Sequence, residues 1–178
     1  MLLIALPVFL AGCGEAPESA APAAPATKQA LAGSPPPLAS LHAQANELLP
    51  GGPAAFRERL AELKGFPVVV NKWASWCGPC REEFPHFQRQ AVKRGKEVAF
   101  IGVNSMDNDG NAKAFLADYP VTYPSYKDGD GKTSKVFEGS YAFPTTAFYD
   151  KRGRLALVKP GGYKTEADLV KDIERYAR

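Results

Sequence analysis

The chain has 178 residues, with 22 basic and 19 acidic side chains and a formal net charge of +3. This excess is too small and too evenly spread to favour a nucleic-acid partner. Three cysteines are too few for a small fold stapled by disulfides. No stretch reaches the roughly 18 uninterrupted apolar residues of a membrane-spanning helix. The composition therefore favours one globular domain with additional segments.

The chain opens on a short apolar run, residues 1–11 (MLLIALPVFLA), whose length is typical of the apolar core of an export signal. The segment LAGC, which ends at Cys13, resembles the lipobox of bacterial lipoproteins. This resemblance implies cleavage before Cys13 and a lipid on its sulfur. We therefore predict a lipoprotein-type signal peptide over residues 1–12. The alternative is an uncleaved apolar anchor with an incidental cysteine.

The next segment, residues 15–37, is rich in Ala, Pro and Ser and has almost no large apolar residues. It cannot bury enough surface to offset its conformational entropy, and its prolines favour an extended, semi-rigid spacer. We predict that residues 13–37 comprise the lipidated Cys13 and a linker. This linker would hold a globular domain, residues 38–178, clear of a membrane surface in the bacterial cell envelope.

The domain is predicted to begin with two helices and a strand. Apolar residues recur at helical spacing over 38–49, and the Pro-Gly-Gly-Pro segment 50–53 would end that helix. A second helix is predicted over 56–63, ending near Gly65. The β-branched run 68–70 then predicts a central strand buried on both faces.

The most specific motif, Trp76-Cys77-Gly78-Pro79-Cys80, follows this strand and precedes a predicted helix. A helix N-terminus stabilises a thiolate, so Cys77 at that position would have a lowered pKa and would be exposed. Cys80 would lie one turn further on the same side, close enough for a disulfide. Gly78 allows the tight turn, and Pro79 suits a first helical turn. Cys77 would attack a partner's disulfide and Cys80 would resolve the mixed disulfide.

Residues 76–80 are identical to the active-site motif of thioredoxins, and Pro85 matches the helix-kinking proline of that family. The longer segment 68–85, VVVNKWASWCGPCREEFP, is similar to the TlpA/ResA branch of membrane-tethered thioredoxin-like proteins. In that branch an Asn replaces the buried Asp of cytoplasmic thioredoxins, and a Glu follows the second cysteine by three positions. Asn71 and Glu83 stand at these positions. The resemblance covers the whole predicted domain.

A second match to this family is Phe143-Pro144-Thr145-Thr146, which precedes an apolar strand. The resemblance implies that Pro144 is cis and packs against the cysteines. It also implies that the Phe143 backbone pairs with a client's chain as an added strand does. The alternative is an ordinary trans proline at a strand start.

Three residues around the motif keep open interpretations. Glu83 is either a solvated helix residue or a carboxylate that handles protons for Cys80 and shifts thiol pKa values. Asn71 cannot accept a proton, so Glu83 is the candidate if proton transfer is needed. Lys72 interrupts an apolar strand, and we predict that it reaches the surface at the strand end. The alternative places it beside the dithiol, where it would lower a thiol pKa.

A Cys-x-x-Cys pair also suits half of a structural zinc site, which needs four protein ligands. The chain's only histidines are His42 and His86, and Cys13 lies across the linker, so we predict no metal. A purely structural disulfide would close a loop too short to constrain the unfolded chain. We expect no cofactor other than the redox-active disulfide itself.

The remaining pattern predicts alternating strands and helices and then a hairpin. The expected elements are a strand over 97–103, a polar loop over 104–111, a helix over 112–119, an extended segment over 123–126, a turn over 127–132, a short helix over 134–141, strands over 145–149 and 155–158, and a final helix capped by Thr165 with Asp168. This order predicts an α/β thioredoxin-like fold, a central mixed sheet flanked by helices, with an N-terminal helical extension and an insertion before the Pro144 loop.

We therefore expect an extracytoplasmic thiol–disulfide oxidoreductase acting on client protein cysteines, as a monomer. Its Gly-Pro dipeptide resembles reducing thioredoxins, which favours a reductant recycled by a membrane thiol partner. The ResA-like resemblance implies apocytochrome c as the client. Two alternatives stay open: an oxidant that donates disulfides to exported proteins, and a tethered binding module in which the cysteines are incidental.

Overall fold

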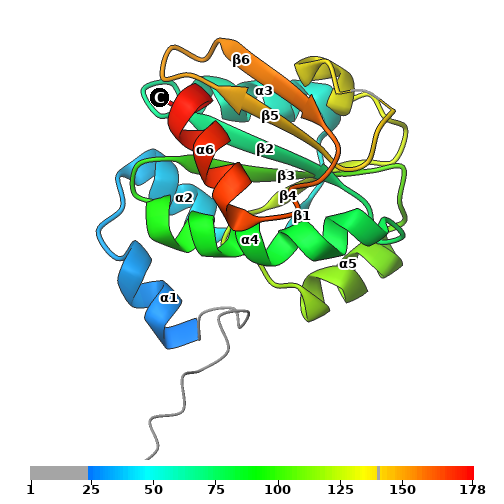
Figure 1. Cartoon of the computed structure of the whole chain (residues 1–178), viewed down its shortest axis with the longest axis horizontal. Helices are drawn as coiled ribbons and strands as arrows, with labels where there is room; N and C mark the ends of the chain where they lie inside the picture. Colours follow the sequence, from blue (N-terminus) through cyan, green and yellow to red (C-terminus); the bar gives the residue numbers. More distant parts are fainter. Residues whose placement is uncertain (1–23, 140) are drawn as a thin grey trace, which may run out of the picture.

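The computed structural model describes residues 24–139 and 141–178, which form one mixed sheet covered by helices on both faces (Figure 1). The strands are β1 (Leu48–Leu49), β2 (Val68–Trp73), β3 (Ala99–Ser105), β4 (Ser125–Asp128), β5 (Thr145–Tyr149) and β6 (Leu155–Pro160). Their order in the sheet is β1-β4-β3-β2-β5-β6. The first four are parallel, whereas β5 runs antiparallel to β2 and β6 antiparallel to β5. This architecture confirms the predicted fold class.

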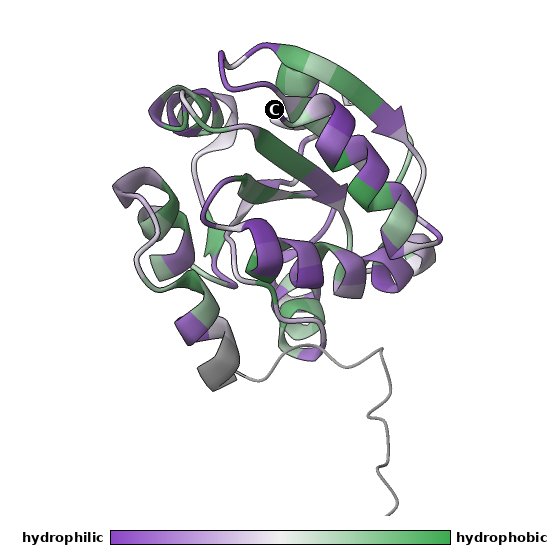
Figure 2. Ribbon diagram, turned by 60° about the vertical axis from the view of Figure 1, so that its left-hand side comes forward, coloured by the Kyte–Doolittle hydropathy of each residue, from purple (hydrophilic) through white to green (hydrophobic). Residues whose placement is uncertain are grey.

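The helices divide into two layers. They are α1 (Ala24–Leu31), α2 (Pro36–Ala43), α3 (Gly52–Glu62), α4 (Gly78–Arg94), α5 (Asp109–Asp118), the 3-10 helix η1 (Ser134–Phe137) and α6 (Glu166–Tyr176). One core joins the sheet to α4, α5 and α6, and the other joins it to α2, α3 and η1. Accordingly, much of the length of the central strands is green, the colour of hydrophobic residues, in Figure 2. Each large apolar side chain buried there contributes about 1.5–3 kcal/mol to folding.

The central strand β2 is buried along its whole length, as its β-branched sequence predicts. It lies between β3 and β5, with Lys72 opposite Thr145 in the antiparallel pair. The end of β2 therefore meets the beginning of β5. This register brings the cysteine motif and the Pro144 loop together, although they lie far apart in the sequence.

Because Gly102 on β3 has no side chain, Trp73 of β2 and Ser125 of β4 can approach each other across β3. A Cβ atom at this position would lie 2.0 Å from Ser125 Oγ and 3.0 Å from Trp73 Nε1. Because the glycine leaves this space free, the buried Trp73 indole donates a 3.0 Å hydrogen bond to Ser125 Oγ. The contact joins β2 to β4 across β3.

The prediction of one helix over 38–49 is wrong in its second half. The helix α2 ends at Ala43, and Leu48–Leu49 form β1, which pairs in parallel with β4. Asn46 between them has a left-handed backbone (φ 64°). Its side chain accepts from Val121 N and donates to Leu116 O. These long-range bonds stabilise a turn that local periodicity cannot indicate.

The extended spacer predicted up to residue 37 is also wrong in part, because α1 and the start of α2 fall inside it. Leu31 is buried. Its Cδ2 packs so closely on Gly95, just after α4, that a Cβ atom added to Gly95 would lie 2.7 Å from it. The packed domain therefore begins before residue 38. Cys13, the predicted signal peptide and the first part of the linker lie outside the described residues. Within the described part of the chain, no helix has the length and apolar character required to cross a membrane.

The C-terminal elements agree closely with the sequence prediction. β5 and β6 form the predicted hairpin, and Thr165 caps α6 by accepting a 3.2 Å hydrogen bond from Asp168 N. Two boundaries differ. The polar loop after β3 is shorter than predicted, since α5 already begins at Asp109. The short helix predicted over 134–141 ends at Phe137, because Glu138 takes a left-handed conformation.

Candidate active site

Cys77 and Cys80 form a disulfide at the start of α4, with Cα atoms 5.3 Å apart. Cys77 is the N-cap residue, and its Sγ accepts a 3.2 Å hydrogen bond from Cys80 N. Gly78 and Pro79 are the first residues of α4, as the motif predicted. The positive end of the helix dipole thus points at the Cys77 sulfur, which stabilises a thiolate there.

Neither cysteine is freely exposed in this disulfide form. Cys77 is 4% exposed and Cys80 0%, so the prediction of an exposed Cys77 is wrong, although Cys77 is the more accessible of the two. Trp76 stands exposed beside them, and its ring lies 4.8 Å from that of Phe143. The Phe143–Pro144 peptide bond is cis, as predicted. Pro85 lies inside α4 at its predicted position, where it removes one backbone donor.

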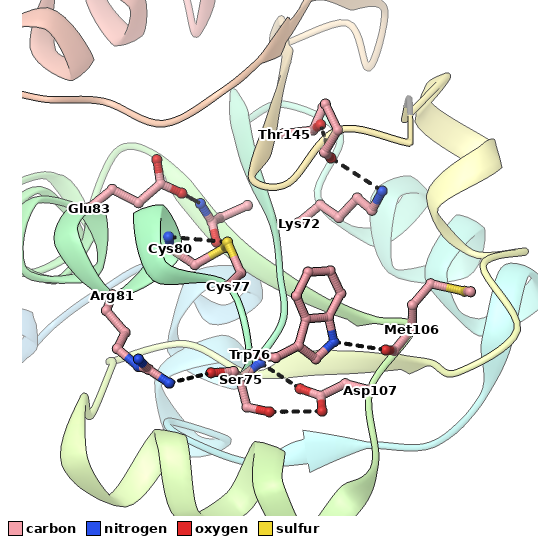
Figure 3. The surroundings of a disulfide bond; sticks show 12 residues. Lys72, Ser75, Trp76, Cys77, Cys80, Arg81, Glu83, Met106, Asp107 and Thr145 are labelled. Carbon is pink, nitrogen blue, oxygen red and sulfur yellow. Dashed lines mark hydrogen bonds between the residues drawn. A yellow bond between two sulfur atoms is a disulfide. The ribbon is translucent and has the colours of Figure 1, made fainter.

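Glu83 is fully buried (0% exposed), which excludes the solvated interpretation. Asn71 Nδ2 donates a 2.6 Å hydrogen bond to Glu83 Oε1, and Tyr163 N donates a 3.1 Å bond to Oε2 (Figure 3 shows the first). Burial raises the pKa of Glu83 from 4.5 to about 7, against the lowering effect of these two hydrogen bonds and of the Lys159 charge. The site therefore contains a carboxyl group that titrates near neutral pH.

The loop between β6 and α6 closes the space over this carboxylate. A Cβ atom on Gly162 would lie 3.4 Å from Pro144 Cγ and 3.6 Å from both Pro79 Cβ and Glu83 Oε2. Gly161 N donates a 2.9 Å hydrogen bond to Pro144 O. The two motif prolines and the buried Glu83 thus converge at one point, which sequence spacing alone does not reveal.

Lys72 does not reach the surface, so that prediction is wrong. Its side chain is 3% exposed, with Nζ 3.9 Å from the centre of the Phe143 ring and 3.5 Å from Ala142 O. It projects from β2 towards the loop before β5, away from the two sulfurs (Figure 3). Burial lowers the pKa of Lys72, and the Asp128 charge opposes this shift. The register between β2 and β5 holds Lys72 beneath Phe143.

Asp107, which the sequence analysis missed, fastens the active-site loop. Its carboxylate accepts hydrogen bonds from Ser75 N (2.6 Å) and Ser75 Oγ (2.8 Å), which Figure 3 shows. It also accepts from Asn104 Nδ2 and from the Asn108 backbone N–H. Burial raises the pKa of Asp107, but these hydrogen bonds hold it below its ordinary value. The sequence could have indicated Asp107 as a site residue, because it follows a predicted parallel strand. The carboxyl ends of parallel strands lie at the same edge of a sheet, where sites form.

Met106, the neighbour of Asp107, also belongs to the site and was not predicted. Its carbonyl accepts a 3.0 Å hydrogen bond from Trp76 Nε1, and its side chain is exposed beside Trp76. Its backbone is left-handed (φ 54°), a conformation that costs a non-glycine residue free energy and is concentrated at functional sites. Residues 106–107 and 75–76 therefore form one hydrogen-bonded unit next to Cys77.

The zinc alternative finds no support in the side chains near the cysteines. His42 Nε2 contacts Gly95 O at the far end of α4, and His86 Nδ1 contacts Arg89. Among the described residues, no group of three or more His, Cys, Asp or Glu side chains is arranged to hold a metal ion.

Comparison with known proteins identifies relatives of this chain. A family model described as Redoxin matches residues 32–174. The thioredoxin-like protein YneN of Bacillus subtilis (strain 168) is 31% identical over 122 residues, 66% of this chain and 71% of the relative. The thiol-disulfide oxidoreductase ResA of the same organism is 30% identical over 106 residues, 59% of each chain. The structure of a DsbF homologue from Corynebacterium diphtheriae matches with 33% identity and a TM-score of 0.56, covering 65% of this chain and 75% of that one.

The matched region contains the complete sheet, the cysteine pair and the Pro144 loop. The relatives and the Cys77–Cys80 disulfide agree on one class of enzyme, the thiol–disulfide oxidoreductases. The chain spans about three fifths of ResA, so the clients and partners of that protein do not transfer with the alignment. The chain belongs to the Redoxin family, as a thioredoxin-like protein of the TlpA/ResA type.

Proposed function

We propose that this oxidoreductase works in the bacterial cell envelope and reduces disulfides in client proteins. The observation that carries the proposal is the position of Cys77 as the N-cap of α4, with Cys80 N–H directed at its sulfur. Both the helix terminus and the hydrogen bond favour the thiolate over the thiol. Cys77 is therefore the nucleophile and Cys80 the resolving cysteine.

The reaction has two exchange steps. In the first, the Cys77 thiolate attacks one sulfur of a client disulfide, forms a mixed disulfide and releases the client's other sulfur as a thiolate. In the second, the Cys80 thiolate attacks Cys77 Sγ, forms the Cys77–Cys80 disulfide and releases the first client sulfur. The client gains two electrons and the enzyme loses them. A dithiol of a membrane recycling partner then reduces Cys77–Cys80 by the same chemistry, so the two sulfurs are the only redox group that the reaction needs.

Glu83 takes the proton that Cys80 must lose before the second step. It lies three residues after Cys80 on α4, hence on the same side of the helix. Its pKa of about 7 allows it to bind and release a proton near neutral pH. Asn71 keeps one oxygen in place, and the Gly162 loop shields the carboxylate from water.

The client lies across the surface beside Cys77. Trp76 and Met106 are exposed there, and Phe143 packs behind Trp76. In the Pro144 loop, the Ala142 carbonyl accepts a hydrogen bond from Thr145 Oγ1, and the Pro144 carbonyl accepts one from Gly161 N. We assign the Phe143 backbone the role of pairing with an extended client chain.

The location and partners follow from the sequence resemblances. A lipid on Cys13 anchors the chain to a membrane outside the cytoplasm, and residues 14–23 separate this anchor from α1. The similarity to the ResA type favours apocytochrome c as the client, in cytochrome c maturation. One chain contains every group in the two exchange steps, so the proposal is for a monomer.

The deciding test is the reduction potential of Cys77–Cys80, measured by equilibration against a dithiothreitol or glutathione series. A potential near that of thioredoxin, about −270 mV, supports a reductant. A potential at or above about −180 mV contradicts it and makes the protein a disulfide donor. A binding module with incidental cysteines would retain client binding in Cys77→Ser and show no exchange in the wild type.

A further inference from the structure

The end of the molecule opposite the disulfide has a concentration of basic side chains. A hollow of about 470 Å³ lies beside the turn between β5 and β6. A second hollow adjoins it and shares Lys151 and Arg178. The basic residues that line the two hollows, here called the basic end, are Arg94, Lys151, Arg152, Arg154, Arg175 and Arg178.

This concentration accounts for the charge of the whole chain. The two hollows contain six basic side chains and three acidic ones, Glu97, Asp150 and Glu174. Their excess of three positive charges equals the formal net charge of the complete sequence, +3. The side chains outside the two hollows therefore carry no net formal charge, and the excess of positive side chains lies in the hollows.

Most of these cations are not neutralised by neighbours. Arg154 pairs with Asp150 and Arg94 with Glu174, each at 2.7 Å. Among the described residues, no ion pair involves the other four basic side chains, which are all exposed. These four are Lys151, Arg152, Arg175 and Arg178. Exposed, unpaired cations grouped at one end attract a negatively charged surface.

The topology fixes where this end lies. β5 begins beside the active site at Thr145 and ends at Tyr149, where the turn to β6 starts. Likewise, α4 begins at the disulfide and ends at Arg94. The basic end is therefore the far end of the same sheet and helix that hold the disulfide at the near end (Figure 1).

The N-terminal part of the domain reaches the same end. Leu31, the last residue of α1, packs against Gly95, which directly follows Arg94. Residues 1–23, which contain the proposed lipid site, precede α1 in the chain. The last turn of α1 thus lies near the C-terminal end of α4, and α1 lies away from the disulfide at the start of α4 (Figure 1).

We propose that the basic end docks on an anionic phospholipid surface and so holds the disulfide facing away from the membrane. The choice of a lipid surface rests on the envelope location proposed above, whereas the charge pattern is independent of the exchange chemistry. Each Lys or Arg held near an anionic bilayer contributes favourable free energy to membrane binding, as each basic residue of a juxtamembrane polybasic segment does. A single acyl chain binds only weakly and stable anchoring takes two signals, so the basic end would add an attachment to the lipid anchor and would orient the domain.

The test compares vesicle binding of the full chain carrying Cys13→Ser, so that no sample is lipidated. Binding is measured on pure phosphatidylcholine vesicles and on vesicles that contain phosphatidylglycerol. We expect tighter binding to the anionic vesicles and loss of that difference at high salt. The double substitution Arg152→Glu and Arg175→Glu should weaken anionic binding about tenfold or more.

The matched control is the double substitution Lys113→Glu and Lys135→Glu, which changes the net charge by the same amount. Both lysines are exposed, one on α5 and the other on η1. This control should bind like the parent chain. Equal binding to both vesicle types, or an equal loss in both double variants, would overturn the proposal. Abolition of the difference by inorganic phosphate at constant ionic strength would also overturn it, since it would indicate a site for a free anion.

Insulin reduction, measured on the same samples, separates this inference from the proposed function. Arg152→Glu with Arg175→Glu should reduce insulin as fast as the parent chain, which also shows that the variant is folded. If the parent chain fails to reduce insulin, the proposed exchange activity is wrong, and the lipid comparison still decides the docking surface.

Discussion

The side-chain amide of Asn71 donates a 2.6 Å hydrogen bond to the carboxylate of Glu83, and this bond joins the central strand to the helix that holds both cysteines. The other carboxylate oxygen accepts from Tyr163 N, in the loop before α6. Three separate parts of the chain therefore enclose one acidic group. Figure 3 shows this group, Glu83, on the same helix as the two cysteines. This enclosure determines how stability and exchange depend on pH.

Replacing Glu83 by Gln should change the pH dependence of stability. Burial raises the pKa of Glu83 from 4.5 to about 7, so the folded state binds this proton more tightly than the unfolded state does. The stabilising effect is complete below pH 4.5 and is lost as the pH rises to about 7. Between about pH 4 and pH 8 the wild type should therefore lose about 3 kcal/mol relative to Glu83→Gln, measured by denaturant unfolding of the oxidised forms.

Glu82→Gln is the control for this series, because Glu82 is the exposed neighbour on the same helix. Its stability should follow the wild type at every pH. A constant difference between Glu83→Gln and the wild type across this range would show that Glu83 does not titrate near neutral pH.

The same substitution should slow the second exchange step. Without a carboxylate at position 83, Cys80 loses its nearby proton acceptor, and the mixed disulfide should resolve about 10²-fold or more slowly. Stopped-flow measurement of thiol release from a preformed mixed disulfide isolates this step. Formation of the mixed disulfide at Cys77 should change far less, and an equal loss in both steps would argue for general distortion of the site.

Lys159 should tune the pKa of Glu83. Its Nζ lies 4.0 Å from the centre of the Tyr163 ring, and its charge lowers the Glu83 pKa. Replacing Lys159 by Met should therefore move the pH midpoint of the resolving step upward, by less than about one unit since Lys159 is partly exposed. Lys164→Met, at an exposed position in the following loop, should leave the midpoint unchanged. A downward shift in Lys159→Met would reverse the assignment.

Asp107 should be required for a stable active-site loop. In Asp107→Ala the Ser75 backbone N–H and hydroxyl lose their acceptor, and we expect a loss of about 1–3 kcal/mol in the free energy of unfolding. Insulin reduction should fall with it, because Trp76 and Cys77 follow Ser75 directly. Asp107→Asn keeps one acceptor oxygen and should recover part of both losses.

Asp109→Ala provides a comparison for Asp107, since Asp109 lies two residues further on and pairs with Lys127 at the surface. Its effect on stability should stay within about 0.5 kcal/mol. If the two alanine variants behave alike in urea unfolding and in insulin reduction, Asp107 has no special role in the loop.

The two cysteines should give different products when each is replaced by Ser. Cys77→Ser removes the nucleophile and should abolish exchange without a trapped intermediate. Cys80→Ser retains the nucleophile and should accumulate a mixed disulfide with client proteins. Non-reducing electrophoresis followed by mass spectrometry identifies the linked cysteine. Accumulation in Cys77→Ser instead would exchange the two roles.

The sequence by itself determined the fold class and the centre of the site. The Trp-Cys-Gly-Pro-Cys motif lies between a β-branched strand and an amphipathic helix, and each of these signals is local in the chain. The same holds for the β5–β6 hairpin and the Thr165 cap, whose geometry depends on a few adjacent residues. Phe143-Pro144 could be recognised only through the family resemblance, since its partners are distant in sequence.

Only the tertiary structure decided the surroundings of the disulfide, because these depend on contacts between distant segments. Burial of Glu83 requires Asn71 and the Gly162 loop, and Lys72 is buried because strand register places it beneath Phe143. Asp107 belongs to the site only once the ends of β2 and β3 are neighbours. Leu48 and Leu49 form a strand because β4 offers a free edge, which periodicity cannot show. Local patterns specify elements and reactive residues, whereas pKa values and loop positions depend on packing between elements.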